Sequence, residues 1–323
     1  MKVLITGVTG MVGSHLADYI LDYHPSVEIF GLVRWRSPLD NIRASLDRIT
    51  LVHGELRDLS SMIEVIREVR PDKIFHLGAQ SFVPTSYHSP GDTFAVNVNG
   101  SGNLLDAVRN IGLDPLIHMC SSAEVYGQVD ETMIPITENT PFNPASPYAV
   151  SKVGQDLLGS QYYITYGLKI IRTRMFTHSG PRRGDFFAES SFAKQIAEIE
   201  LGIVSNPVKV GNLESIRTYA DVRDAVRAYW ALLEKCTPGD VYNIGGERTL
   251  SIGQILEILK SFARVPIEHV VDPELLRPAD VTLQIPQSNK FLEQIGWKPA
   301  YPLEQTLEDL LNYHRVRTKM RLK

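Results

Sequence analysis

The chain has 323 residues, of which 43% are hydrophobic and 22% are charged, and its formal net charge is −4. This composition is typical of a globular protein with a sizeable core. The small negative charge gives no electrostatic reason to expect a nucleic-acid partner. No apolar run has transmembrane length, so no membrane partner is expected. Two cysteines, Cys120 and Cys236, do not make a disulfide framework, which favours reduced thiols and a cytoplasmic protein without a signal peptide.

The first half of the chain alternates apolar runs with helical patterns. Strands are predicted at 2–6, 27–33, 50–53, 72–79, 114–122 and 168–176, and helices at 10–23, after Leu59, at 94–112 and at 146–166. This alternation requires right-handed crossovers between parallel strands. The fold class predicted is therefore α/β, with a Rossmann-type doubly wound parallel sheet.

The pattern becomes less regular beyond about residue 180, where shorter helical and strand-like segments follow one another. We expect residues 1–175 to form a cofactor-binding Rossmann domain, which a late segment around 220–245 rejoins. Residues 176–323 are expected to form mainly a smaller α/β lobe that binds the substrate.

Three glycines, Gly7, Gly10 and Gly13, lie directly between the first strand and its helix. The first glycine permits a tight turn, the second lets the backbone approach a pyrophosphate, and the third lets the helix pack on the strand. The N-terminus of the helix offers free N–H groups to the phosphates. A glycine-rich turn without a ligand is the alternative, but the strand–turn–helix context favours a dinucleotide site.

The end of the second strand discriminates between cofactors. An acidic residue there would bind the ribose hydroxyl of NAD, but the chain has Arg34, Arg36 and Ser37. Guanidinium groups suit the 2′-phosphate of NADP, although an exposed basic loop is the alternative. Farther on, Asp58 is expected either to bind the adenine amino group or to belong to a surface turn.

The segment SPYAVSK at 146–152 is the strongest chemical motif. Tyr148 and Lys152 are four residues apart on a predicted helix and so share one face. A nearby ammonium lowers the pKa of a phenol, so we expect Lys152 to lower the pKa of Tyr148. Such a tyrosine can accept a proton from a sugar hydroxyl while a hydride leaves the same carbon. A chance Tyr-Lys pair on a helix is the alternative.

The chain resembles the extended short-chain dehydrogenase/reductase family of nucleotide-sugar enzymes. The similar segments run through nearly the whole chain: GVTGMVGSHL, FHLGAQSFV, VNVNGSGNLLDA, SSAEVYG, SPYAVSK and GWKP. The resemblance implies that Ser122 is the hydroxyl of the catalytic triad and that Tyr126 is structural or a pocket wall. It also implies cofactor contacts at Thr9, Met11, Leu59, Leu77, Ala79, His178 and Arg183, and substrate contacts at Ser81, Thr177 and Val210.

Glu124 separates members of that family. By resemblance, 4-epimerases have a small or hydroxyl residue at this place, whereas 4,6-dehydratases have a carboxylate that removes the C5 proton. Some uronate decarboxylases and 4-keto-sugar reductases also have Glu there. A carboxylate that caps a neighbouring backbone group is the structural alternative.

Several segments resemble the GDP-mannose 4,6-dehydratase branch and the neighbouring GDP-4-keto-6-deoxy-D-mannose reductases. FTHSGPRRGDFF contains Arg182 and Arg183, which by resemblance bind a cofactor phosphate or a neighbouring subunit. Lys194, Arg217 and Arg277 would hold the guanosine diphosphate, with surface salt bridges as the alternative. The chain departs from the branch at four positions, namely Ser122, Thr177, Thr218 and Asp280.

The resemblance implies an NADP-dependent GDP-mannose 4,6-dehydratase that needs no metal. The alternatives are the reductase, a nucleotide-sugar 4-epimerase and, outside enzymes, an NADP-sensing regulator. Helices at 94–111 and 146–166 pair with copies of themselves in this family, which implies a homodimer or homotetramer.

Overall fold

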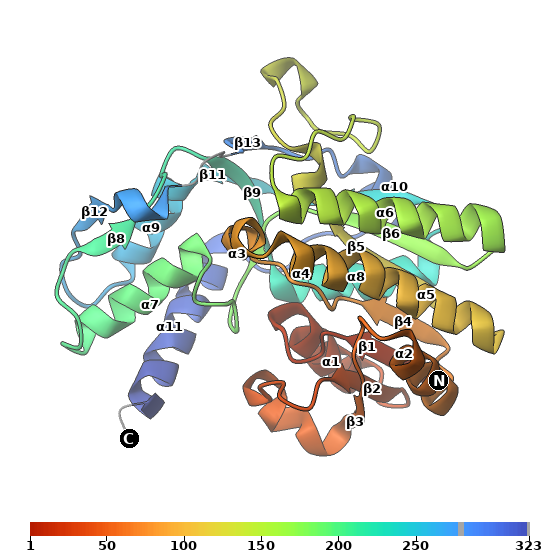
Figure 1. The fold of residues 1–323 in the computed structure, drawn as a ribbon. Coiled ribbons are helices and arrows are strands. Elements are labelled where there is room, and N and C mark those ends of the chain that lie inside the picture. Colours follow the sequence, from red (N-terminus) through yellow and green to blue (C-terminus); the bar gives the residue numbers. More distant parts are fainter. Residues whose placement is uncertain (277–280, 322–323) are drawn as a thin grey trace.

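A parallel sheet forms the centre of the larger part of the molecule (Figure 1). The computed structural model describes residues 1–276 and 281–321, and within them seven strands lie in the order β10-β6-β5-β4-β1-β2-β3. All neighbouring pairs are parallel, which confirms the predicted doubly wound fold. The strands are β1 (Lys2–Thr6), β2 (Glu28–Val33), β3 (Thr50–His53), β4 (Lys73–His76), β5 (Leu116–Ser122), β6 (Ile170–Met175) and β10 (Val241–Ile244).

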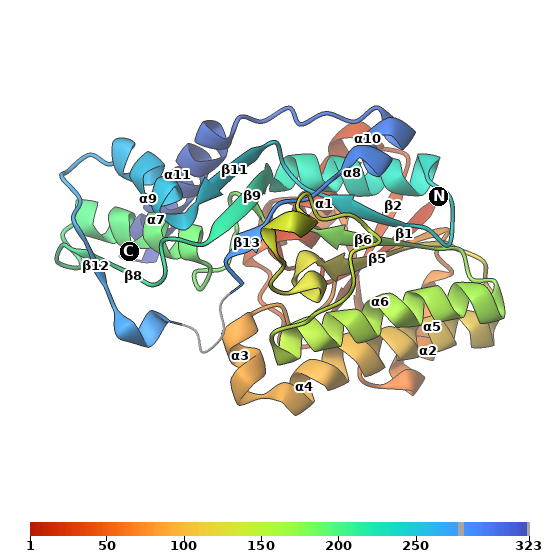
Figure 2. The same cartoon turned by 90° about the horizontal axis from the view of Figure 1, so that it is seen from above.

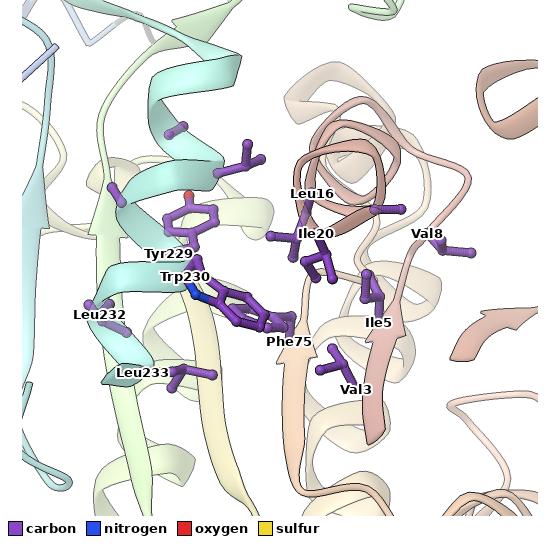
Figure 3. Packing of buried hydrophobic residues seen from close by; sticks show 14 of the residues in the cluster. Val3, Ile5, Val8, Leu16, Ile20, Phe75, Tyr229, Trp230, Leu232 and Leu233 are labelled. Atoms are coloured by element: carbon purple, nitrogen blue, oxygen red, sulfur yellow. The ribbon is translucent and has the colours of Figure 1, made fainter. Parts of the chain in front are cut away.

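Helices cover both faces of this sheet (Figure 2). One face carries α2 (Leu59–Val69), α5 (Gly100–Ile111) and α6 (Pro147–Tyr166), and the other carries α1 (Met11–Tyr23) and α8 (Val222–Lys235). Strand residues alternate between the faces, so Val3 and Ile5 pack with α1 and α8 while Leu4 packs under α2 and α5. Figure 3 shows the first of these cores, in which Phe75 and Trp230 stack between strand β4 and helix α8.

Two predicted elements differ in extent from the structure. The strand predicted at 72–79 ends at His76, because the backbone N–H groups of Leu77 and Gly78 bind the Thr6 hydroxyl and turn the chain. The helix predicted at 94–112 contains a π-helical segment, Ala95–Asn99, between α4 (Pro90–Phe94) and α5. A short helix α3 (Val83–His88) precedes it.

A smaller lobe lies beside the carboxyl ends of the strands (Figures 1 and 2). Its hydrophobic cluster includes Phe192, Ile196, Leu256 and Leu307. Helix α10 (Asn289–Ile295) and strand β10, by contrast, pack in the larger part, so the late chain contributes to both. The lobe elements are β7 (His178–Ser179), α7 (Ala188–Glu200), β8 (Val208–Val210), β9 (Ile216–Asp221), β11 (Arg248–Ser251), α9 (Ile252–Ser261), β12 (His269–Val271), β13 (Leu283–Gln284) and α11 (Leu303–Arg321).

Among the described residues, no helix combines the length and the apolar character that a membrane span requires. Likewise, residues 1–276 and 281–321 contain no group of three or more His, Cys, Asp or Glu side chains that could hold a metal ion.

A buried ion-pair network joins α6 to β6. Asp156 is fully buried and accepts hydrogen bonds from Arg172 and Arg174, each at 2.9 Å. Arg174 also donates to the Tyr126 hydroxyl at 2.9 Å, and that hydroxyl donates to the Asn243 side chain at 2.7 Å. Tyr126 therefore has a structural role, and the network fixes the helix that carries the Tyr-Lys motif.

Replacing Asp156 with Asn should lower the free energy of unfolding by about 3 kcal/mol, because it leaves two buried guanidinium groups without a compensating charge. Chemical denaturation followed by circular dichroism measures this loss. Asp114→Asn is the control, since Asp114 pairs with Lys169 at the exposed surface and the change should cost less than about 1 kcal/mol. Equal losses for the two variants would contradict the role given to Asp156.

Candidate active site

Tyr148 and Lys152 lie at the start of α6. The helix begins here because the Ser146 hydroxyl accepts the N–H of Ala149 at 3.1 Å and Pro147 occupies the first turn. Tyr148 is 8% exposed and Lys152 is 5% exposed. Helix α6 packs against β5, so both side chains lie near the carboxyl end of that strand. The structure thus brings Tyr148, Lys152 and Ser122 together.

Ser122 is the last residue of β5, and Glu124 lies two residues later in the short turn that follows the strand. The Ser122 hydroxyl accepts the N–H of Glu124 at 3.2 Å and caps the short turn that follows the strand. The Glu124 carboxylate accepts a hydrogen bond of 3.4 Å from the amide of Gln284 on β13. Burial raises the pKa of Tyr148, and the negative charge of Glu124 contributes to this shift. Within residues 1–276 and 281–321, the hydrogen bond of the Glu124 carboxylate is thus to a side chain and not to the backbone.

The pKa of Tyr148 is raised well above its usual value by burial, and a hydrogen bond from Ser122 acts in the opposite direction. In this structure, burial outweighs the lowering that Lys152 is predicted to exert. The Lys152 ammonium lies 5.9 Å from the centre of the phenol ring and donates to Cys120 O and Gln155 Oε1. Burial also lowers the pKa of Lys152.

The glycine triplet forms the tight cradle that the motif predicts. Gly7 has a positive φ of 73°, and a Cβ there would lie 2.9 Å from Gly78 Cα. A Cβ at Gly13 would lie 2.2 Å from Gly7 O, so the helix could not pack this close with any other residue. Gly10 is the N-cap of α1 and has no side chain to occupy the first N–H groups. These features fit the pyrophosphate of a dinucleotide.

The loop after β2 presents its cations to solvent. Arg34 and Arg36 are exposed, and Arg36 stacks on Trp35 with 4.2 Å between the guanidinium carbon and the ring centre. The Ser37 hydroxyl accepts the N–H of Arg34 at 3.0 Å, which closes the turn. Among the described residues, neither arginine forms an ion pair, so both can reach a phosphate.

Other residues predicted at the cofactor lie around the same strand ends. Asp58 is the N-cap of α2 and accepts the N–H of Ser61 at 2.9 Å, which gives it a structural role beside any contact to adenine. Leu59 begins that helix and is exposed. Leu77 and Ala79 follow β4 and are half-buried, as is Thr9 beside the cradle, whereas Met11 is buried.

The segment after β6 docks onto α1. Arg182 pairs with Asp18 of that helix at 2.6 Å. Arg183 pairs with Glu189 at 3.1 Å. Burial dominates the raised pKa of Tyr148, and the charge of Arg183 acts in the opposite direction. Burial lowers the pKa of His178 to about 4, with a further contribution from the charge of Arg183.

The residues predicted at the sugar nucleotide have mixed outcomes. The side chain of Val210 is fully buried in the lobe core, so its predicted substrate contact is wrong for the side chain. Lys194 pairs with Glu198 at 3.1 Å along α7, which is the salt bridge named as its alternative. Arg217 is 8% exposed and donates to Ile216 O at 3.0 Å.

The remaining positions are the predicted substrate contacts Ser81, Thr177 and Arg277 and the departures Thr218 and Asp280. Ser81 is exposed after β4, and Thr177 is half-buried between β6 and β7. The departure at Thr218 has a structural partner, because its hydroxyl lies 2.8 Å from that of Thr249 on β11. Arg277 and Asp280 lie outside the described residues.

Comparison with known proteins agrees with this arrangement. Residues 4–310 match the family described as GDP-mannose 4,6 dehydratase. The chain belongs to this family. It is 32% identical to the GDP-6-deoxy-D-mannose reductase of Pseudomonas aeruginosa, with 96% of each chain covered. It is 31% identical to the GDP-mannose 4,6-dehydratase of Yersinia enterocolitica, with 96% of this chain and 92% of the relative covered.

A solved structure of RMD from Pseudomonas aeruginosa, complexed with NADPH, superposes with a TM-score of 0.85. The match has 31% sequence identity and covers 98% of this chain and 99% of that chain. The resemblance to the extended short-chain dehydrogenase/reductase family is thereby confirmed. The two relatives are named as different enzymes, one a reductase and the other a dehydratase.

Two residues of the site were not predicted from the sequence. Gln284 approaches Glu124 from a strand 160 residues away in the chain, and no local signal marks it. Gln155 accepts a hydrogen bond from Lys152 at 2.7 Å. Its position three residues after Lys152, on the same face of the helix, could have predicted this contact from the sequence.

Proposed function

We propose that this protein is an NADP-dependent GDP-mannose 4,6-dehydratase that forms GDP-4-keto-6-deoxy-D-mannose. The observation that carries the proposal is the position of Glu124. It lies in the short turn after β5, two residues after Ser122, and the Ser122 side chain hydrogen-bonds Tyr148. A 4,6-dehydratase needs a base beside the group that handles the C4 hydroxyl, and a simple reductase does not.

Each residue of the candidate site has its own role in the proposed reaction. Tyr148 takes the proton of the C4 hydroxyl, and Ser122 hydrogen-bonds the same oxygen. Because burial raises the pKa of Tyr148, the phenolate needs stabilisation, which the Ser122 hydroxyl and the charge of Arg183 favour. NADP, when bound, supplies hydride removal at C4 and hydride return at C6. Lys152 orients the cofactor ribose through its ammonium.

Glu124 acts on the neighbouring carbon. A ketone at C4 acidifies the proton at C5, and a carboxylate can remove it and pass it to the C6 hydroxyl, which leaves as water. When hydride adds at C6, C5 takes up a proton from solvent. Gln284 donates to the Glu124 carboxylate and so holds it in one orientation. Net oxidation does not occur, since the hydride lost at C4 is regained at C6.

The GDP-6-deoxy-D-mannose reductase relative makes the reductase the second candidate. The purified protein, incubated with GDP-mannose and without added NADPH, tests the choice. We expect GDP-4-keto-6-deoxy-D-mannose to accumulate, as detected by mass spectrometry with a loss of one water. Turnover only with the keto sugar and NADPH would support the reductase and contradict the proposal.

The cofactor preference rests on Arg34 and Arg36 and on the NADPH named for the structural relative. Replacing Arg34 with Ala should weaken NADP binding about tenfold and leave NAD binding unchanged, because a charged hydrogen bond to the 2′-phosphate is lost. Fluorescence titration of both dinucleotides measures this. Arg43→Ala removes an exposed arginine that pairs with Asp40 and serves as the control. Equal weakening of NADP and NAD would contradict the assignment.

The proposal includes a second copy of the chain as partner. Val150, Leu157 and Ile164 recur every seven residues along α6 and are 43%, 52% and 75% exposed. This apolar stripe supports a homodimer through α6, and a tetramer would require a further contact.

A further inference from the structure

A chain of hydrogen bonds runs from Lys152 into the core beneath the catalytic groups. The ammonium donates to Cys120 O at 2.9 Å and to Gln155 Oε1 at 2.7 Å. A lysine ammonium has three donors. The two buried acceptors therefore set the direction of the third donor, which is the one that can serve Tyr148 or a cofactor hydroxyl.

The partners of Gln155 fix the orientation of its amide. Lysine can only donate, so Oε1 must face the ammonium, and Nε2 then donates to the Ser101 hydroxyl oxygen at 2.9 Å. Ser101 donates its own hydrogen to Asn97 O at 2.6 Å. Gln155 and Ser101 are both fully buried, so rotation of the amide would leave buried polar groups unpaired.

Ser101 also connects this chain to the glycine cradle through His76. Because the Ser101 hydrogen is already committed, His76 donates from Nε2 to Ser101 at 2.9 Å and accepts the Thr6 hydroxyl at Nδ1, 2.8 Å away. The Thr6 oxygen in turn accepts the N–H groups of Leu77 and Gly78. Burial lowers the pKa of His76 to about 3, so the ring is neutral and keeps this tautomer at neutral pH.

We infer that Gln155 is a positioning residue that holds the Lys152 ammonium in place and couples it, through Ser101 and His76, to the cradle for the dinucleotide. Each group in this hydrogen-bond network donates to an acceptor in the protein, so packed groups and not the ligand direct two of the three ammonium donors. The hydrogen bonds do not depend on the proposed function, whereas the expected effect on kcat rests on it.

Replacing Gln155 with Leu keeps the volume but removes one accepted and one donated hydrogen bond. We expect kcat for GDP-mannose to fall at least tenfold, with KM changed by less than about twofold, because the lysine is misplaced while the sugar contacts remain. Gln195→Leu is the control, since Gln195 in the lobe also accepts one hydrogen bond, from Lys209 N–H, and its amide donates to Lys209 O and to the Ser191 hydroxyl. A kcat equal to that of Gln195→Leu would overturn the inference.

A second measurement is independent of the reaction. The titration of Lys152 is followed by NMR of ¹³Cε-labelled lysine in the protein saturated with NADP, with the signal assigned by Lys152→Met. Gln155→Glu should raise the pKa of Lys152 by about one unit, because a carboxylate favours the charged ammonium, and Gln155→Leu should lower it. The other groups that face Lys152 stay unchanged in both variants, namely Tyr148 on α6, His118 and Cys120 on β5, and His76 on β4.

The kinetic assay and the lysine titration distinguish failure of the proposed function from failure of the inference about Gln155. A wild-type protein that leaves GDP-mannose unchanged would refute the proposed function, and the lysine titration alone would then decide on Gln155. If Gln155→Leu does not fold, Gln155→Glu decides, since it keeps the shape and the acceptor. A pKa of Lys152 that is the same in wild type and in Gln155→Glu would overturn the inference.

Discussion

Replacing Tyr148 with Phe is expected to lower kcat for GDP-mannose by about 10³- to 10⁴-fold, since proton transfer by a positioned side chain contributes about this much. The aromatic ring stays in its buried site. Only the hydroxyl is lost, which hydrogen-bonds Ser122 and whose pKa is influenced by the charges of Glu124 and Arg183. Binding of the sugar nucleotide should be nearly unchanged. Steady-state kinetics, with calorimetric titration of GDP-mannose, measure both quantities.

Tyr126→Phe is the matched control, because it removes a second buried phenol hydroxyl close to the same strand. That hydroxyl binds Arg174 and Asn243 within the structural network, so the loss should lower stability by about 1 to 3 kcal/mol and leave kcat within about threefold. A Tyr148→Phe protein that turns over as fast as Tyr126→Phe would refute the assignment of the catalytic phenol.

Replacing Glu124 with Gln should lower dehydration by about 10²- to 10⁴-fold while the oxidation at C4 continues. The amide keeps the size of the side chain but cannot accept the C5 proton. Single-turnover samples, quenched and reduced with borodeuteride, should therefore contain hexose labelled with deuterium at C4. In ²H₂O, the wild-type product should acquire deuterium at C5, and the variant should form almost none.

Glu138→Gln is the control for this change. Glu138 lies in the segment between β5 and α6 and accepts the N–H of Asn243 at 2.7 Å, so its replacement should affect stability but not the ratio of the two steps. Rapid dehydration by Glu124→Gln would exclude Glu124 as the base and would reopen the choice between a dehydratase and a reductase.

Local patterns predicted the parts of the site that are built locally. Gly7, Gly10 and Gly13 lie within one turn between a strand and its helix, and the structure shows the tight cradle that their spacing predicts. Tyr148 and Lys152 lie on one helix whose start is set by Ser146 and Pro147. In each case the physical constraint acts between residues a few positions apart, and a single sequence displays it.

The features that sequence reasoning missed depend on packing between distant segments. Gln284 reaches Glu124 only because β13 pairs with β9 beside the end of β5, and the pKa of Tyr148 depends on how deeply α6 is buried. Val210 is a different case. Alternation in the segment VKV, with buried Val208 and Val210 around exposed Lys209, already indicated that its side chain faces a core.

The central claim is that one active site oxidises C4, removes water across C5 and C6, and returns the same hydride to C6. It is tested most directly with GDP-mannose that carries deuterium at C4. Nuclear magnetic resonance of the product should show that deuterium at C6 of GDP-4-keto-6-deoxy-D-mannose when no NADPH is added. A deoxy product without deuterium at C6, or recovered GDP-mannose with its label still at C4, would contradict the account.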